Sequence, residues 1–177
     1  MAGASLAPDQ AHQVAPTIYA AAGPGYTGGD IVEPGAKRVS FTFRRQLTVE
    51  WGYCDPGGIV FNSRFFEMFD ISSWMLFEAA LGVKPQELAS TFGIVGIPLV
   101  DARANFLKPA KFGDAAEITS WVSEFRRSSF DIEHHLSING ELAVEGSETR
   151  VWAARDKDNP DKIHSHAIPA EVIEKFG

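Results

Sequence analysis

The sequence predicts an α+β domain in which an antiparallel five-stranded sheet wraps around one long central helix. Three observations lead to this class. A strand-like segment with a period of two ends near residue 51, a long helix-like segment follows at 63–81, and four more strand-like segments come after residue 98. A helix that carries many aromatic side chains has to be covered, and a curved sheet around it is the simplest cover.

The first strand is predicted from the run F-T-F-R-R-Q-L-T-V-E-W at 41–51. Its apolar and polar residues alternate, which is typical of a strand with one buried face. The apolar set is Phe41, Phe43, Leu47, Val49 and Trp51, and the polar set is Thr42, Arg44, Gln46, Thr48 and Glu50. We expect the ordered domain to cover 39–177. Residues 1–38 are rich in Ala, Gly and Pro without a clear period, which predicts a flexible extension.

The long helix is predicted over 63–81 because apolar residues recur there at spacings of three and four. Asn62 or Ser63 is expected to cap its start, and Gly82 to end it. A short second helix is expected at 85–91. The wide stripe expected to face the sheet consists of Phe65, Phe66, Phe69, Ser73, Leu76, Phe77 and Ala80.

Four further strands are predicted at 99–108, 116–126, 130–138 and 141–153. Asn139-Gly140, between the last two, is a strong signal for a tight hairpin turn. A short terminal helix is expected at 169–176. We expect the four strands to form a meander to which the first strand is added. One long helix wrapped by such a sheet is the arrangement called the hot-dog fold.

Composition limits the classes of function. The net charge is −7, and broad nucleic-acid binding needs a basic surface, so no nucleic-acid partner is expected. The single cysteine allows neither an internal disulfide nor a cysteine-built zinc site. No stretch approaches about eighteen continuous apolar residues, and the first basic residue is Lys37, so neither a membrane span nor a secretory signal is expected. A cytoplasmic protein is the resulting expectation.

Three stretches, in order along the chain, carry a family resemblance. They are L-T-V-E-W-G-Y-C-D-P-G-G-I-V-F-N-S-R-F-F-E-M-F-D at 47–70, G-I-V-G-I-P-L-V-D-A-R-A-N-F at 93–106 and E-F-R-R-S-S-F at 124–130. They resemble the 4-hydroxybenzoyl-CoA thioesterases, a family of hot-dog acyl-CoA thioesterases. The resemblance implies hydrolysis of a thioester with no metal and no cofactor, since coenzyme A is part of the substrate. It also implies active sites at subunit interfaces of a homodimer or homotetramer.

Asp55 is the catalytic carboxylate by this resemblance. A carboxylate can attack the thioester carbonyl to form a mixed anhydride, or it can deprotonate a water molecule, and the residues favour neither route. Taken alone, Asp-Pro-Gly-Gly is also good turn chemistry. The neighbouring Cys54 is a rival nucleophile, but it has no histidine near it in sequence to act as a base. We therefore interpret Cys54 as a small packed side chain.

Asn62 and Asp70 are expected to serve the acyl end of the substrate. By resemblance, the backbone N–H of Asn62 at the helix start polarises the thioester carbonyl. Related enzymes often carry an aromatic residue or histidine at this position, and a backbone donor tolerates the change. Asp70 lies about 12 Å further along the helix axis. The matching aspartate of the hydroxybenzoyl-specific enzymes binds the para-hydroxyl group. The alternative for Asp70 is a carboxylate paired with an arginine or exposed at the rim.

Arg126 and Arg127 match a pair that contacts the nucleotide of coenzyme A in the family. Arginine suits phosphate, although an exposed, solvated pair is the plain alternative. The family often continues with a third basic residue, where this chain has Ser128. His134 falls on the apolar face of its strand, where we expect a hydrogen-bonded core residue. His164 and His166 lack a recognisable set of metal ligands.

The function expected from these residues is hydrolysis of an aromatic acyl-CoA, such as 4-hydroxybenzoyl-CoA, to the free acid and coenzyme A. One alternative is a short- or medium-chain aliphatic acyl-CoA thioesterase of the same fold, because the aromatic helix side chains can simply form core. An alternative of another class is an acyl-CoA-binding module without catalysis. The presence of the Asp55 carboxylate argues against the second alternative.

Overall fold

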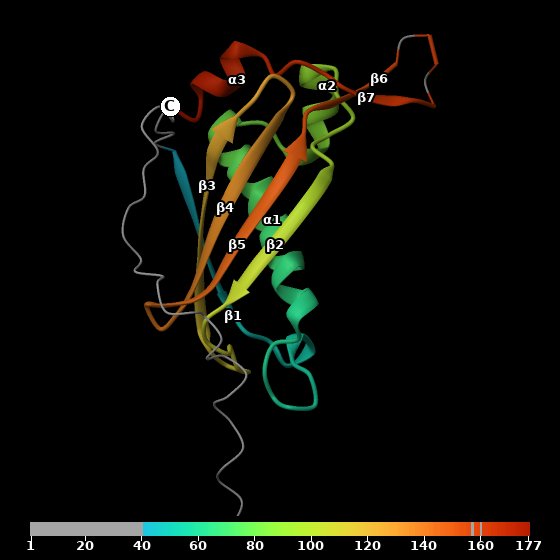
Figure 1. Ribbon diagram of the computed structural model, residues 1–177. Coiled ribbons are helices and arrows are strands. Elements are labelled where there is room, and N and C mark those ends of the chain that lie inside the picture. The colour runs from blue at the N-terminus through green and yellow to red at the C-terminus, as the bar shows by residue number, and fades with distance from the viewer. Residues whose placement is uncertain (1–40, 157, 160) are drawn as a thin grey trace, which may run out of the picture. The chain divides into compact units, whose positions relative to one another are not determined.

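The computed structural model describes residues 41–156, 158–159 and 161–177, in which one sheet covers one long helix (Figure 1). The sheet is antiparallel, with five strands in the order β1-β3-β4-β5-β2. Its strands are β1 (Thr42–Thr48), β2 (Leu99–Phe106), β3 (Ala115–Phe125), β4 (Ser129–Ile138) and β5 (Glu141–Val151). The helix is α1 (Asn62–Leu81). These elements confirm the predicted α+β class, whereas the proposed extension at 1–38 lies outside the described residues.

Smaller elements connect the sheet and the helix. They are η1 (Trp51–Tyr53), η2 (Pro85–Glu87), α2 (Leu88–Phe92), β6 (Ala153–Arg155), β7 (Ile163–Ser165) and α3 (Ala170–Glu174). The pair β6–β7 forms a separate two-stranded sheet that the sequence did not predict. None of the helices in the described part of the chain is both long and apolar enough to cross a membrane.

Two backbone signals were predicted correctly. Gly82 follows α1 in the left-handed conformation (φ 68°) and its N–H bonds to the Glu78 carbonyl at 2.8 Å, which ends the helix. Asn139 and Gly140 both have positive φ, at 51° and 83°, as the tight turn between β4 and β5 requires.

The core consists of two apolar clusters that follow one another along α1. One forms around Phe65 and Phe69 and the other around Leu76 and Phe77, all of them buried. Ser73 lies on α1 between the two clusters and is fully buried as well. The other buried polar side chains in the described residues are Ser72, Ser120, His134, Glu148 and Arg150. Together with Ser73 they form a polar layer between the two apolar clusters.

The predicted four-strand meander is wrong in one respect. Strands β3, β4 and β5 follow one another as neighbours, but β2 pairs with β5 at the edge of the sheet rather than with β3. The reason is the eight-residue connection 107–114 between β2 and β3. It is longer than a hairpin loop, so it can cross to the other side of the meander. The free edge of β3 is occupied by β1.

The predicted buried face of the first strand is correct for Val49 and wrong for Trp51. Val49 is 1% exposed, whereas Trp51 is 69% exposed. Strand β1 ends at Thr48 and the chain then enters η1, so the alternation of the strand no longer sets the direction of the Trp51 side chain. The Trp51 ring instead packs edge-on against exposed Phe112, with ring centroids 5.8 Å apart.

Candidate active site at the start of the long helix

A short loop connects η1 to α1 and carries Asp55. The loop folds back on itself through a bridge between Cys54 and Val60. The Asp55 N–H donates to the Ile59 carbonyl at 2.9 Å, and the Asp55 carbonyl accepts from the Gly58 N–H at 2.9 Å. Gly58 has a φ of 78°, which suits glycine. This local folding makes a short hairpin in which Asp55 lies toward the tip and Tyr53 pairs with Phe61, the residue before α1.

The Asp55 carboxylate also stabilises its own turn. Its Oδ1 accepts a hydrogen bond of 2.7 Å from the Gly57 N–H. A Cβ atom at position 57 would lie 3.0 Å from that oxygen, so glycine permits the close approach. The side chain is half-buried, and no described residue donates to its second oxygen. The turn-forming role and an available carboxylate oxygen therefore coexist.

Cys54 is half-buried and packs against the apolar cluster around Phe65 and Phe69. Its Sγ lies 3.8 Å from the Glu50 carbonyl. The position agrees with the interpretation of this thiol as a packed side chain.

The prediction that Asn62 or Ser63 caps α1 is wrong. Phe61 is the capping position, with extended angles (φ −66°, ψ 133°) and no side-chain cap, and Asn62 is the first helical residue. The Phe61 N–H donates to the Tyr53 carbonyl at 2.9 Å, so the hydrogen bonds of the loop continue up to the helix start. The first N–H groups of a helix have no acceptor inside the helix, and the helix dipole places partial positive charge there. The Asn62 N–H is one of these groups.

Asp70 lies about two turns further along α1 and is paired with an arginine. Its Oδ1 accepts a hydrogen bond of 2.6 Å from Arg150 Nη2. The Asp70 side chain is 48% exposed, while that of Arg150 is 2% exposed. The arginine-paired alternative for Asp70 is thus present in the structure, and it leaves the second carboxylate oxygen accessible.

Arg150 belongs to the buried polar layer between the two apolar clusters. Its Nε donates to Glu148 Oε2 at 2.8 Å, and Ser73 Oγ donates to the same oxygen at 2.6 Å. His134 lies against Ser73 and Glu148 through Nε2, at 3.3 and 3.5 Å, and against Ser120 Oγ through Nδ1, at 2.8 Å. The layer joins α1 to three neighbouring strands. It confirms that His134 is a hydrogen-bonded core residue.

The ionisation of this layer follows from its contacts. Burial lowers the pKa of His134 below its usual 6.5, against the opposing influence of Glu148, so the ring is neutral near pH 7. Burial by itself would raise the pKa of Glu148. The hydrogen bonds with His134 and Arg150 outweigh that effect and lower the pKa of Glu148 to about 2. Burial also opposes the charge of Arg150, but Glu148 and Asp70 raise its pKa. A neutral imidazole therefore lies next to an ionised arginine–glutamate pair.

Sequence reasoning missed Arg150 and Glu148, although a signal was present. In the last long strand, Glu148 and Arg150 occupy the same face as Val144 and Trp152, which are fully buried. Charged residues at inward positions of a strand are rarely buried without partners. The alternation of β5 thus indicated a buried ion pair.

Arg126 and Arg127 lie at the opposite end of the sheet from Asp55. They form the turn after β3, while the Asp55 loop follows β1, whose end pairs with the beginning of β3 at Ala115. The 11 residues of β3 separate the two ends by roughly 30–35 Å. Within one chain, Asp55 and Asn62 therefore lie at one end of the sheet, and the two arginines lie at the other.

The two arginines also differ from each other. Arg126 is bound to Asp131 and, at 3.0 Å, to Glu124, and the hydrogen bond with Asp131 raises its pKa. The exposed side chain of Arg127 makes no ion pair with any described residue. Arg127 is accordingly the more accessible cation of the pair.

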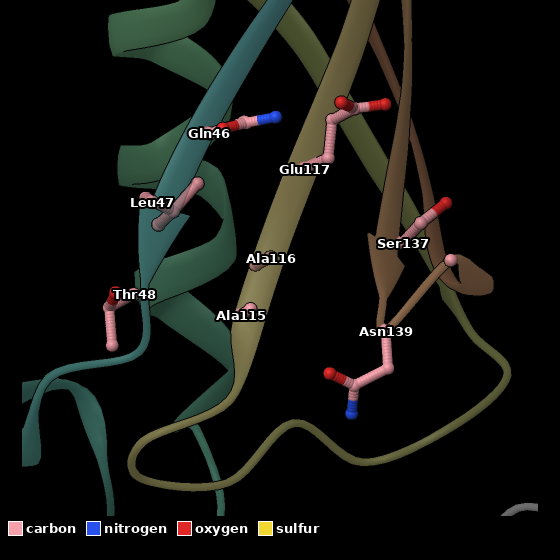
Figure 2. Close-up of a pocket in the computed structure, with 9 residues that line it drawn as sticks. Gln46, Leu47, Thr48, Ala115, Ala116, Glu117, Ser137 and Asn139 are labelled. Atoms are coloured by element: carbon pink, nitrogen blue, oxygen red, sulfur yellow. The ribbon is translucent and has the colours of Figure 1, made fainter.

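A hollow of about 440 Å³ lies on the outer side of the sheet (Figure 2). Gln46, Glu117 and Ser137 form a row across β1, β3 and β4, with Asn139 at the following turn. The lining contains none of the five predicted site residues. His164 and His166 have ring centroids 6.3 Å apart, and the described residues contain no group of three or more His, Cys, Asp or Glu side chains arranged to hold a metal.

Comparisons with known proteins agree on one family. A family model described as the thioesterase-like superfamily matches residues 49–176. The chain is 31% identical over 135 residues to the 4-hydroxybenzoyl-CoA thioesterase of Pseudomonas sp. (strain CBS-3), a match that covers 73% of this chain and 93% of that protein.

Solved structures extend this likeness to the fold. A mutant 4-hydroxybenzoyl CoA thioesterase complexed with 4-hydroxybenzoyl CoA aligns with a TM-score of 0.71 at 29% identity, over 78% of this chain and 100% of that one. A gentisyl-coenzyme A thioesterase aligns with a TM-score of 0.64 at 30% identity, over 73% of this chain and 98% of that one. The predicted hot-dog fold is confirmed, and the chain belongs to the thioesterase-like superfamily.

Proposed function

We propose that this protein hydrolyses an aromatic acyl-CoA of the 4-hydroxybenzoyl-CoA kind to the free acid and coenzyme A. The observation that carries the proposal is the junction at the start of α1. There, a short hairpin loop carries the Asp55 carboxylate and leads directly into the unbonded N–H end of a 20-residue helix that begins at Asn62. The relatives named for 4-hydroxybenzoyl-CoA and gentisyl-CoA hydrolysis support an aromatic acyl group.

The chemistry needs two groups, and we assign both to this junction. Asp55 either attacks the thioester carbonyl carbon and expels the coenzyme A thiolate, leaving a mixed anhydride for water to cleave, or takes a proton from the water that attacks. Both routes place negative charge on the carbonyl oxygen. The Asn62 N–H, aided by the helix dipole, is the proposed donor to that oxygen, and one such donor is typically worth roughly a hundred- to a thousand-fold in rate.

Asp70 is proposed to contact the far end of the acyl group. It lies eight residues beyond Asn62 on α1, about 12 Å along the axis, and helical side chains lean back toward the helix start. A benzoyl group with its carbonyl at Asn62 would therefore point its para position toward Asp70. The exposed half of the Asp70 side chain supports a polar contact there.

We propose further that the active protein is a homo-oligomer, a dimer or tetramer, with sites at subunit interfaces. If Arg126 and Arg127 bind the nucleotide of the substrate that Asp55 cleaves, they come from another copy, because within one chain they lie at the opposite end of β3. The outer edge of β2 is available for pairing with a second copy. It exposes Leu99 (44%) and Val100 (61%).

Cofactor use and location follow as proposals from the same reasoning. A carboxylate and a backbone donor suffice for thioester hydrolysis, so coenzyme A enters only as part of the substrate. The acidic composition and single cysteine support a cytoplasmic protein that binds neither nucleic acid nor membrane.

The deciding experiment is a hydrolysis panel of aromatic and aliphatic CoA thioesters with the wild type and Asp55→Asn. We expect turnover of aromatic esters and a loss of at least about a hundred-fold in kcat for Asp55→Asn, with an unchanged far-UV spectrum. A folded Asp55→Asn protein that keeps its activity would exclude Asp55 as the catalytic group. Preference for aliphatic esters would favour the short- or medium-chain enzyme. Tight binding without turnover would favour an acyl-CoA-binding module.

A further inference from the structure

Arg150 is held by three acceptors from three parts of the fold. Its Nε donates to Glu148 Oε2 (2.8 Å), its Nη1 to the Ile97 carbonyl (3.2 Å) and its Nη2 to Asp70 Oδ1 (2.6 Å). The residue is 1% exposed. Each guanidinium nitrogen therefore has a partner, and the planar group cannot rotate without losing one of them.

The partner at the inner side of Arg150 is itself fixed. Glu148 Oε2 accepts from Ser73 Oγ at 2.6 Å and faces His134 Nε2 at 3.5 Å, while Ser120 Oγ contacts the other ring nitrogen at 2.8 Å. The His134 ring also stacks on Phe69 at 4.8 Å. The position of Arg150 is thus set by α1, β3, β4 and β5 together.

Asp70 is the only member of this network whose carboxylate reaches solvent. Its side chain is 48% exposed against 1% for Glu148. Arg150 occupies Oδ1, and no donor among the described residues reaches Oδ2. Because Arg150 is shared between two carboxylates, the group of three keeps one net negative charge. A carboxylate oxygen accepts hydrogen bonds, so Oδ2 can accept one from a donor group on a ligand.

We infer that Arg150 is a positioning residue for the acyl pocket: it fixes Asp70 so that Oδ2 accepts a hydrogen bond from a hydroxyl group on the aromatic ring. This inference rests on the proposed function and adds what determines the orientation of Asp70. We therefore expect the site to prefer a substrate whose ring carries a neutral hydroxyl over one whose ring carries none. A substrate with a ring carboxylate should be disfavoured, because that group would face the anionic Asp70.

The test compares kcat/KM for 4-hydroxybenzoyl-CoA and benzoyl-CoA, and its readout is their ratio. The main variant is the double substitution Glu148→Gln with Arg150→Met, which removes both buried charges so that neither is left uncompensated. A matched control is Arg45→Met. Arg45 also joins the sheet to α1, through the Met68 carbonyl (3.0 Å) and Ser72 Oγ (3.3 Å), but does not touch Asp70.

The double variant should lower the ratio about tenfold or more, the usual worth of a hydrogen bond to a charged group. Adding Asp70→Asn to it should lower the ratio little further, because both changes remove the same contact. Arg45→Met should leave the ratio at the wild-type value. If the folded double variant keeps the wild-type ratio, with kcat/KM reduced equally for both substrates, Arg150 has only a structural role. That result would overturn this inference and leave the proposed function standing.

The wild type separates this inference from the proposed function. If it hydrolyses neither aromatic ester, the proposed function and the inference both fall. If it hydrolyses both equally well, only the inference falls. Should the double variant not fold, Arg150→Lys replaces it. Lysine keeps the charge beside Glu148, but one ammonium group cannot span all three acceptors, so the ratio should still fall.

Discussion

The Asp55 carboxylate stabilises its turn and is also the proposed catalytic group. Oδ1 holds the turn through the Gly57 N–H, and the remaining oxygen is available to a substrate or a water molecule. The amide oxygen of an asparagine can accept the same hydrogen bond, so Asp55→Asn is expected to preserve the loop while removing the charge. For this reason asparagine is a better probe of catalysis at this position than alanine, which would also remove the turn contact.

The proposed backbone donor at Asn62 can be removed by a single substitution. Proline lacks an N–H but is favoured at the first position of a helix, and Phe61, with ψ at 133°, already has the conformation that precedes proline. We expect Asn62→Pro to lower kcat by roughly a hundred- to a thousand-fold with little change in thermal stability, because one oxyanion donor is lost.

Asn62→Ala is the control for that substitution, since it removes the side chain and keeps the N–H. Steady-state kinetics and thermal unfolding should be measured for both variants. Equal activity of a folded Asn62→Pro protein and Asn62→Ala would contradict the assignment of this donor.

The sequence predicts Asp55, Asn62 and Asp70 as site residues through a resemblance, but it does not predict the contacts around them. The partner of Asp70 is 80 residues away, and no local pattern indicates that Arg150 reaches it. Turn propensity correctly indicated that Asp55 shapes its loop. The start of α1 was misplaced by one residue because the cap is a phenylalanine without a capping side chain, held by backbone bonds instead.

Strand β5 lies close to the Phe69 side chain of helix α1 at Gly146. A Cβ atom at this position would lie 2.4 Å from Phe69 Cε2, and that ring is fully buried and stacked on His134. We expect Gly146→Ala to lower the free energy of unfolding by about 1–3 kcal/mol, as overpacking of a core does. Urea denaturation measures this change. Gly52→Ala is the control, because nothing lies within 4 Å of its added Cβ. Similar stability of the two variants would mean that the contact at Gly146 is not tight.

Elements with local signals were predicted, whereas the order of the strands was not. The 3.6-residue period predicted α1, and Gly82 predicted where it ends. Asn139-Gly140 predicted the hairpin between β4 and β5. The place of β2 beside β5 depends on which sheet edge is free after β1 has paired with β3. That choice is made by pairings between distant segments, which the pattern within one strand does not specify.

The whole domain should lose stability as the pH falls from 7 to 5. His134 is neutral in the fold, with a pKa below the ordinary 6.5, so the unfolded chain binds a proton in this range that the folded chain does not. Stability therefore rises with pH wherever this difference holds. Glu148 affects stability at lower pH. Its contribution to the free energy of unfolding is complete above about pH 4.5 and is lost as the pH falls toward about 2, because the fold lowers its pKa.

Urea denaturation at pH 5, 6, 7 and 8 measures this dependence. His134→Gln should be less stable than the wild type at pH 8 but show a weaker decline toward pH 5, since it removes the buried titrating group. The same slope in both proteins would mean that other histidines cause the dependence.

The distance along β3 between the Asp55 loop and the Arg126–Arg127 turn has a genetic consequence. If one substrate spans the two ends through neighbouring copies, each site takes its catalytic group and its nucleotide contacts from different chains. A chain damaged at one end and a chain damaged at the other, each inactive alone, would then complement each other in a mixed oligomer. Some of the sites in that oligomer would combine the intact Asp55 loop of one chain with the intact arginine turn of the other.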